Sequence, residues 1–212
     1  NTITQKRTIS TFEAIDISSA INVTVNEGSY NGEITVEAPD NIMDRIVTEV
    51  QSGVLVVKIK GTVSLKNEKI KVTFPHQKLR GFNVSGASNV TVLPTMKVDK
   101  MAIDLSGASV LKLDVVSNLV SVDNSGASSM KISGNTQNFN IEVSGASSLT
   151  AKDLKAANVT IDCSGASSAT VWAVDNLTAD SSGASSVRYI EQNGLKTVVD
   201  TSGMSSVKSI SK

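Results

Sequence analysis

Hydrophobic and polar residues alternate along most of this chain, and the alternation repeats around a Ser-Gly-Ala-Ser motif that becomes Ser-Gly-Met-Ser in its last copy. In every copy the residues four before and four after the glycine are apolar, and the residue five after it is polar. The repeated glycines are Gly86, Gly107, Gly126, Gly145, Gly165, Gly183 and Gly203. Alternation with a period of two is typical of half-buried strands. Each copy therefore predicts a strand, a Ser-Gly-Ala corner, a second strand and a short linker.

The glycines follow one another at intervals of 18 to 21 residues, a period that is typical of a solenoid. No copy contains the i, i+3, i+4 spacing of an amphipathic helix, and the Leu/Asn pattern of a leucine-rich repeat is missing. We therefore predict an all-β fold, a single-stranded right-handed parallel β-helix (β-solenoid) with about 20 residues per coil. Glycine is expected at each corner because it adopts positive φ at little cost.

Residues 1–80 lack Ser-Gly-Ala-Ser but contain a degenerate copy of the repeat. Residues 14–25 (AIDISSAINVTV) align with residues 81–92 (GFNVSGASNVTV), with Ser19 in the place of the glycine. Further strands are predicted over 33–38, 46–50, 54–61 and 69–74, and a helical turn within 39–45. A solenoid needs its ends covered. We therefore expect one continuous solenoid, with irregular N-terminal β coils and a cap over 1–80 and the regular repeat over 81–212.

The C-terminal end carries no evident cap. Its last residues include Lys208, Ser209, Ser211 and Lys212, whose polarity could protect an open edge. Docking of a second chain at this end, giving a homo-oligomer, is the alternative.

Composition narrows the possible partners. Lys plus Arg equals Asp plus Glu at 20 each, which argues against nucleic acid and anionic membranes as main partners. No apolar run approaches 18 residues, so no membrane span is predicted. Aromatic residues make up only 3% of the chain, which is low for a glycan-binding groove. The sequence begins at Asn1 without a signal peptide, which suggests a processed or truncated start.

Acidic residues are concentrated three positions before the glycine. This acidic column comprises Asp104, Asp123, Glu142, Asp162, Asp180 and Asp200. Asn83 holds the same position in the first regular copy, and Asp16 holds it in the degenerate copy. Alternation places the column on the outer surface, where neighbouring carboxylates about 5 Å apart would repel by about a few kcal/mol before screening. Such a repeated cost calls for compensation, and the column is the predicted ligand-binding feature.

Three sources of compensation are open. The carboxylates could accept hydrogen bonds from backbone N–H groups of the corner, which we favour. They could pair with the basic residues five places after the glycine, which are Lys112, Lys131, Arg188 and Lys208. A divalent cation such as calcium could also lie between coils, held by Asp123, Glu142, Asp162 and Asp180. The exchange of Asp with Asn and Glu in this position suits a hydrogen-bond acceptor better than a metal ligand, so no cofactor is predicted.

Two further features have a functional and a structural interpretation. The serines around Gly-Ala could form a flat polar surface for a glycan or for ice, but small hydroxyls also fit tight corners, which we favour. Trp172 with Tyr189, one coil later, forms the best candidate contact patch of aromatic residues. Packing of these rings beneath a loop is the alternative.

Catalytic residues are not predicted. His76 is the single histidine and follows Pro75 in an expected surface turn, without a Gly-x-Ser-x-Gly elbow nearby. Cys163 falls at an inward position, which predicts a buried member of a column rather than a nucleophile. The single cysteine also excludes an internal disulfide.

Three segments carry a resemblance to a known bacterial family: FEAIDISSAINVTVNEG, ITVEAPDNIMDRIVTEVQSGVLVVKIKG and KIKVTFPHQKLRGFNVSGASNVTV. They resemble the "putative auto-transporter adhesin, head-GIN-domain" family, which is common in Bacteroidetes. The resemblance covers almost the whole chain and includes the Ser-Gly-Ala-Ser repeats. It implies an exported protein with a right-handed β-helix, located in the periplasm or at the cell surface. Members of the family are often lipid-anchored, and such an anchor would lie upstream of Asn1. It supplies no mechanism.

The sequence therefore favours a non-enzymatic cell-envelope β-helix that presents a polar Ser/Asp face to a surface glycan or protein, as an adhesin or binding scaffold. The first alternative is a carbohydrate-active enzyme, a polysaccharide lyase or hydrolase, on the same scaffold. The second is a structural spacer stabilised by calcium.

Overall fold

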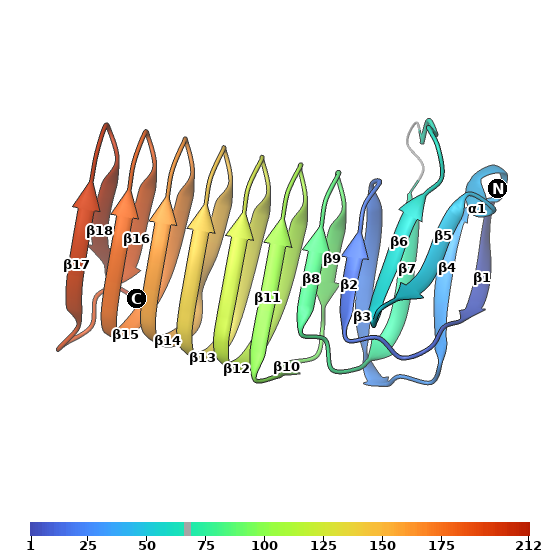
Figure 1. Cartoon of the computed structure of the whole chain (residues 1–212), viewed down its shortest axis with the longest axis horizontal. Helices are drawn as coiled ribbons and strands as arrows, with labels where there is room; N and C mark the ends of the chain where they lie inside the picture. Colours follow the sequence, from blue (N-terminus) through green and yellow to red (C-terminus); the bar gives the residue numbers. More distant parts are fainter. Residues whose placement is uncertain (66–68) are drawn as a thin grey trace.

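The strands wind into an elongated β-solenoid, described over residues 1–65 and 69–212 by a computed structural model (Figure 1). Residues at the same position of successive repeats pair in parallel: Ile103 lies opposite Val122, and Val122 lies opposite Ile141. The predicted β-solenoid with about 20 residues per coil is thereby confirmed.

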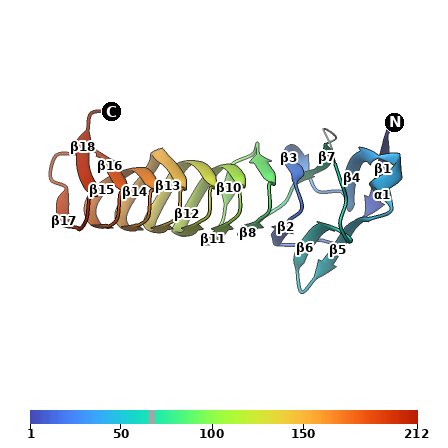
Figure 2. The ribbon, with the colours of Figure 1, turned by 90° about the horizontal axis from the view of Figure 1, so that it is seen from above.

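The described strands form one continuous 18-stranded sheet that is wound so that two of its sides face one another; these sides are called the front sheet and the back sheet below (Figure 2). The front sheet, nearest the viewer in Figure 1, contains β6 (Val54–Ile59), β2 (Ala14–Ile17), β8 (Gly81–Val84), β11 (Lys100–Leu105) and β17 (Lys196–Thr201). The back sheet contains β7 (Ile70–His76), β3 (Ile21–Ser29), β9 (Asn89–Val92), β16 (Ser186–Ile190) and β18 (Ser206–Ile210). Four long strands pass from the back sheet to the front: β12 (Val110–Asn124), β13 (Ser129–Val143), β14 (Ser148–Cys163) and β15 (Ser168–Ser181). The short β10 (Met96–Lys97) pairs with β12 at the lower rim.

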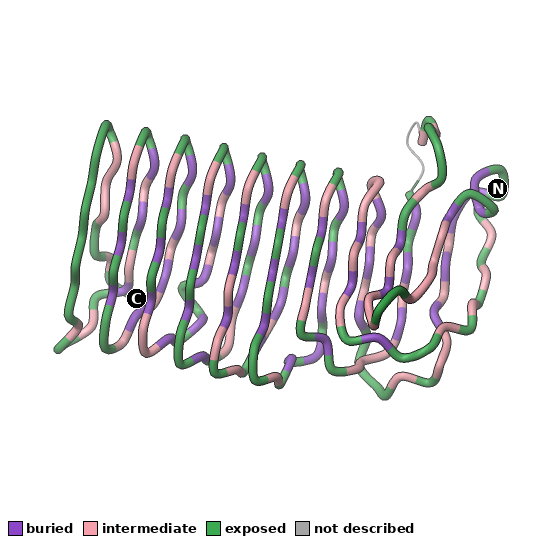
Figure 3. Tube along the Cα trace, in the orientation of Figure 1, coloured by how far each residue is buried: buried purple, intermediate pink, exposed green. Residues whose placement is uncertain are grey.

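The core lies between the two sheets, because every second side chain of each strand points inward. Buried and exposed residues alternate along the coils (Figure 3). Val122, Ile141 and Ile161 form one inward row and are at most 5% exposed. Cys163 is also buried, as its place in the pattern predicted.

The Ser-Gly-Ala corners form the upper rim of the solenoid. All seven glycines adopt the predicted positive φ, between +68° and +73°. The serine that follows Gly-Ala points inward: the Oγ of Ser167 donates to the carbonyl oxygen of Ser164 at 2.6 Å. The equivalent serine is buried in the first six copies and half-buried only in the last, at Ser205, so in those six it is part of the corner and is not available to a glycan or to ice.

The degenerate repeat pairs as its alignment predicted, but its place in the stack differs from chain order. Strand β2 pairs in parallel with β8, where Asp16 lies opposite Asn83, and with β6 on its other side. Strand β3 likewise lies between β7 and β9. The coil made of β2 and β3 is therefore inserted between two coils that follow it in the sequence.

Antiparallel strands and one helical turn close the N-terminal end. Strand β1 (Thr2–Thr8) pairs with β4 (Glu33–Pro39), β4 pairs with β7, and β5 (Ile46–Gln51) pairs with β6, all antiparallel. The predicted helical turn is α1 (Asp40–Met43), which buries Ile42 and Met43. The prediction that His76 lies in a surface turn is wrong: it ends β7, and its carbonyl oxygen accepts a 2.9 Å hydrogen bond from the Tyr30 amide.

Candidate functional site

The acidic column runs along the outer surface of the front sheet. Its residues pair in register from coil to coil: Asp104 with Asp123, Glu142 with Asp162, and Asp180 with Asp200. Every member from Asp104 to Asp200 is exposed. The carboxylates therefore form one continuous row, as the alternation predicted.

A groove of about 880 Å³ follows this row. It extends from the coil of Asp16 to the coil of Asp180. Beside the carboxylates it is lined by the residues five places before each glycine, most of which are small: Gly81, Ala102, Ser121, Asn140, Thr160 and Thr178. Val54 lines it at the N-terminal end, where the β5–β6 hairpin projects from the side of the front sheet (Figure 2). Because these side chains are small, the groove lies directly beside the acidic column.

A row of asparagines accompanies the acidic column on the same sheet, and sequence reasoning missed it. The Nδ2 of Asn176 donates to Oδ1 of Asn158 at 2.7 Å, and the Nδ2 of Asn158 donates to Oδ1 of Asn138 at 3.1 Å. Asparagine occurs seven residues before the glycine in these three consecutive copies, which is the signal that could have revealed it. The row ties neighbouring coils together through side chains.

The predicted hydrogen bonds between the acidic column and the corner are absent. In the described chain no side-chain hydrogen bond reaches these carboxylates. The corner amides instead donate to the preceding coil: Ser164 N–H donates to the Val143 carbonyl at 2.9 Å, and Ala166 N–H to the Gly145 carbonyl at 2.8 Å. The favoured prediction is therefore wrong, because stacking of the coils already satisfies the corner donors.

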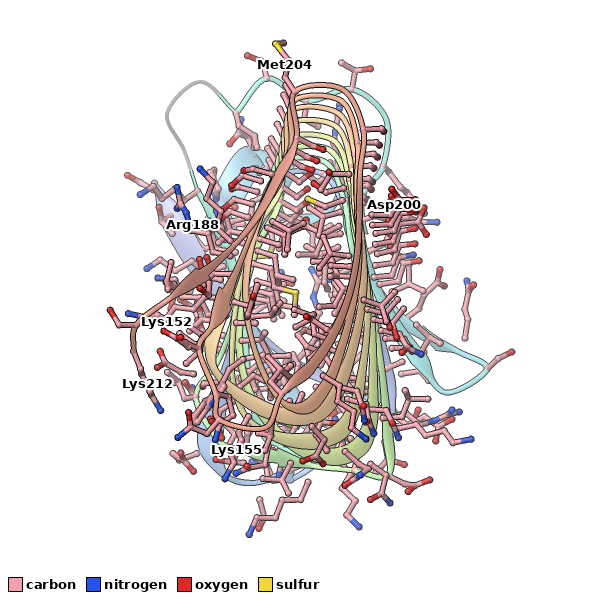
Figure 4. All side chains as sticks on the ribbon, turned by 90° about the vertical axis from the view of Figure 1, so that its left-hand side faces the viewer. Lys152, Lys155, Arg188, Asp200, Met204 and Lys212 are labelled. Atoms are coloured by element: carbon pink, nitrogen blue, oxygen red, sulfur yellow. The ribbon has the colours of Figure 1, made fainter. Side chains whose placement is uncertain are left out.

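The predicted ion pairs are also absent. The chain reverses at the glycine corner, which lies between the acidic residue and the basic residue of each copy. The acidic column therefore lies on the front sheet, and the basic residues lie on the back sheet: Lys112, Lys131, Arg188 and Lys208. In Figure 4 Asp200 and Arg188 lie on opposite sides of the coil. Within the described residues, ion pairs join only Lys6 to Glu33, Lys71 to Glu37 and Arg80 to Glu13.

One member of the column, Asp123, has a shifted pKa. Partial burial, and then the neighbouring charge of Asp104, raise the pKa of Asp123 above its usual value. Over residues 1–65 and 69–212, no three His, Cys, Asp or Glu side chains converge closely enough to hold a metal ion. The part of the chain that the structure describes therefore supplies no ion-pair partner for the column.

The two candidate aromatic residues each contact other parts of the chain. Nζ of Lys212 lies 3.4 Å from the centre of the Trp172 ring, and Nζ of Lys155 lies 5.8 Å from it. Tyr189 lies opposite Val171 and packs against the core. Both rings are half-buried, and a role for them in binding stays a prediction.

The family model described as "Putative auto-transporter adhesin, head GIN domain" matches residues 11–192. The chain belongs to this family. A "putative adhesin" from Bacteroides fragilis has a similar structure, with a TM-score of 0.89 and 21% identity, over 99% of this chain and 97% of that one. A "putative adhesin" from Parabacteroides distasonis has a TM-score of 0.80 and 20% identity, over 99% and 97% of the two chains.

A third similar structure, from Parabacteroides distasonis, is described as a "putative lipid binding protein"; its TM-score is 0.73 at 18% identity, over 99% of this chain and 97% of that one. At these identities the likeness establishes the fold of this adhesin-family chain. A search of curated proteins gave no match. In the described residues no helix is long and apolar enough to cross a membrane.

Proposed function

We propose that this member of the adhesin family is a non-enzymatic scaffold of the cell envelope, which binds a surface glycan or protein through the groove along the acidic column. The observation that carries the proposal is the row of carboxylates from Asp104 to Asp200, to which the described residues supply neither a side-chain hydrogen-bond donor nor an ion-pair partner. Mutual repulsion along the row would be relieved by a ligand that supplies positive charge or hydrogen-bond donors.

The chemistry of the groove limits the ligand. Ionised carboxylates only accept hydrogen bonds, so the ligand must donate them. Lysine and arginine side chains of a protein and the hydroxyls of a neutral glycan meet this condition. An anionic polysaccharide also carries hydroxyls, but the carboxylates of the column would repel its negative charge. Thr160, Thr178 and Asn140 line the same groove and can both donate and accept.

The lining of the groove also supports a non-enzymatic role. It contains no histidine, lysine, arginine, tryptophan or tyrosine among the described residues. Its carboxylates repeat at one position in every coil, whereas a glycosidase places two carboxylates in different environments on either side of one scissile bond. An anchor upstream of Asn1, attaching the scaffold to the envelope, forms part of the same proposal.

The test compares two triple variants that remove the same charge. Asp123→Asn, Glu142→Gln and Asp162→Asn neutralise the centre of the acidic column and keep its shape. Asp153→Asn, Asp175→Asn and Glu191→Gln are the control, because these acids are exposed and lie outside the column. The purified chains are measured on a glycan array and on a panel of basic peptides, at low and at physiological salt.

Loss of retention with the column variant alone supports the proposal. Steep weakening with salt identifies a cationic ligand, since exposed charges are screened within about 8 Å at physiological ionic strength, and weak salt dependence identifies a glycan. Equal retention of both variants removes the column as the binding site. Failure of the unmodified chain to bind either panel overturns adhesion through this groove.

A further inference from the structure

The last coil exposes large apolar side chains. At the equivalent positions the other coils have either buried residues or smaller or more polar ones. Of the five large hydrophobic residues exposed in the described chain, three lie here: Val198 at 68%, Val199 at 45% and Met204 at 85%. Met204 holds the position that is alanine in the other six Ser-Gly-Ala-Ser copies. Val198 holds the outward position of Thr160 and Thr178. Three exposed apolar side chains on one terminal coil indicate an interaction surface at this end of the solenoid.

The core is open at this end. Val199 lies four residues before Gly203, and Val207 lies four residues after it, so the two face the interior from opposite sheets. Their counterparts one coil earlier, Ala179 and Val187, are 2% and 0% exposed. In the described chain β17 pairs only with β15, and β18 only with β16. Both outer edges therefore present free backbone donors and acceptors beside an uncovered core.

The N-terminal end is built differently, because its core is covered. Helix α1 covers it with buried Ile42 and Met43. The guanidinium of Arg7, on the edge strand β1, donates to the carbonyl oxygens of Ile46 at 2.6 Å and Met43 at 3.2 Å. Head-to-tail stacking would need two matching open ends. The open C-terminal end, with its uncovered core and two strand edges, is matched by another copy of itself.

We propose that two copies of this chain join C-terminal end to C-terminal end about a two-fold axis. The axis passes through the sheets at the level of Val199 and Val207. Strand β17 then pairs antiparallel with the partner's β17, and β18 with the partner's β18, so that both sheets continue across the junction. Val199 and Val207 each meet their own copies and close the core.

The charges of the end strands select this register. With the axis at Val199, Asp200 lies opposite the partner's Val198, and Lys208 lies opposite the partner's Ser206, so no like charges face one another. Placing the axis one residue away, at Val198, would set Lys208 directly against the partner's Lys208, which is destabilising. With this axis, the upper rim of one copy lies beside the lower rim of the other. Met204 then lies next to the partner's loop between β16 and β17.

This assembly has a consequence that rests on the proposed function. A two-fold axis perpendicular to the sheets leaves both front sheets on the same side of the dimer. The two acidic columns would then face one surface together, and a dimer could engage two ligands at once, with the gain in avidity that linked sites give.

The experiment measures the oligomeric state of the purified chain by sedimentation velocity and light scattering over a wide concentration range. Val198→Thr with Met204→Ala installs residues that other coils already carry, so the monomer should keep its fold. This pair should raise the dimer Kd by about tenfold or more, as loss of central apolar contacts does at other interfaces. Val199→Lys should abolish the dimer, because it places a charge at the axis.

Leu93→Thr is the matched control, because Leu93 is 55% exposed but lies in the first regular coil. It should leave the dimer unchanged. A chain that is monomeric at every concentration overturns the proposal, and so does growth beyond a dimer. A dimer that responds to Leu93→Thr but not to the end variants also overturns it. This experiment contains no ligand, so a monomeric result would not bear on binding through the groove. The glycan array and the peptide panel test that binding separately.

Discussion

The backbone amide of Ala146 donates a 2.8 Å hydrogen bond to the carbonyl oxygen of Gly126, one coil earlier. The same bond joins successive corners along the upper rim, where Ala127 donates to Gly107 and Ala166 to Gly145. The coils approach closely enough because the next glycine has no side chain: a Cβ on Gly145 would lie 2.5 Å from the Gly126 oxygen. Glycine is therefore required twice, by its positive φ and by the stacking of the corners.

Gly145→Ala should destabilise the solenoid by at least about 3 kcal/mol, since it combines left-handed strain with a backbone collision that neither coil can relieve. Urea unfolding followed by circular dichroism measures the change. Gly194→Ala separates the two causes, because Gly194 has a φ of +81° but nothing within 4 Å of its Cβ position. This control should lose only about 1 kcal/mol. Equal losses for both variants would contradict the stacking argument.

Ser19→Gly should stabilise the chain. Ser19 occupies the glycine position of the degenerate repeat and adopts a φ of +75°. A left-handed conformation costs a non-glycine residue about 1–2 kcal/mol, and the greater freedom of glycine in the unfolded chain offsets part of that. A net gain of about 0.5–1 kcal/mol should appear in the same urea titration. Ser18→Gly, one residue earlier, should not stabilise; a gain there as large as at Ser19 would refute the explanation.

Much of the fold follows from the sequence because the pattern repeats. Inward rows such as Val122 and Ile141, outward Asp123 and the corner at Gly126 are all fixed by their distance from one glycine, so one coil predicts the next. The inserted coil could not be predicted in the same way. Strand β2 has the same alternation as β6 and β8 and fits against either, so the pattern does not reveal which strands are its neighbours.

The candidate site was predicted less completely. The outward position of the acidic column follows from alternation. Which donors or basic residues lie near the carboxylates depends instead on how the chain turns at the corner. The chain reverses there, so Asp180 and Arg188 lie on different sheets, although they are only eight residues apart. The corner amides already bond to the preceding coil, which sequence spacing does not show. The groove depends on the size of residues such as Ala102 and Ser121 relative to their neighbours, which appears only when the coils are stacked.

Asn124→Val should raise the free energy of unfolding. Asn124 is fully buried between Leu105 and Val143, and its Nδ2 donates to the Ser148 carbonyl at 3.0 Å, whereas its Oδ1 has no partner. A buried acceptor left unpaired costs about 1–3 kcal/mol, and valine already fills this position in the next coil. A gain of about 1 kcal/mol in thermal or urea unfolding is expected. A loss of similar size would show that the bond to Ser148 outweighs the unpaired oxygen.

Asp123→Asn should also stabilise the chain at neutral pH, and its effect should vary with pH in a defined direction. Burial and the charge of Asp104 raise the pKa of Asp123 in the folded state. Between the unfolded and folded pKa values the native state binds more protons than the unfolded chain, so this group lowers stability as pH rises through that window. The gain should therefore be present above the folded pKa and disappear below the unfolded pKa, where the carboxyl is protonated in both states.

Because Asp123 is exposed, the gain at neutral pH should be about 0.5 kcal/mol and should shrink with added salt. Unfolding of the two chains compared over acid to neutral pH, at low and high salt, measures it. Asp175→Asn is the control, since Asp175 is exposed outside the acidic column. Asparagine already occupies the column at Asn83, so the change introduces nothing foreign to the fold. A stabilisation that persists at low pH would mean that the carboxylate charge is not the cause.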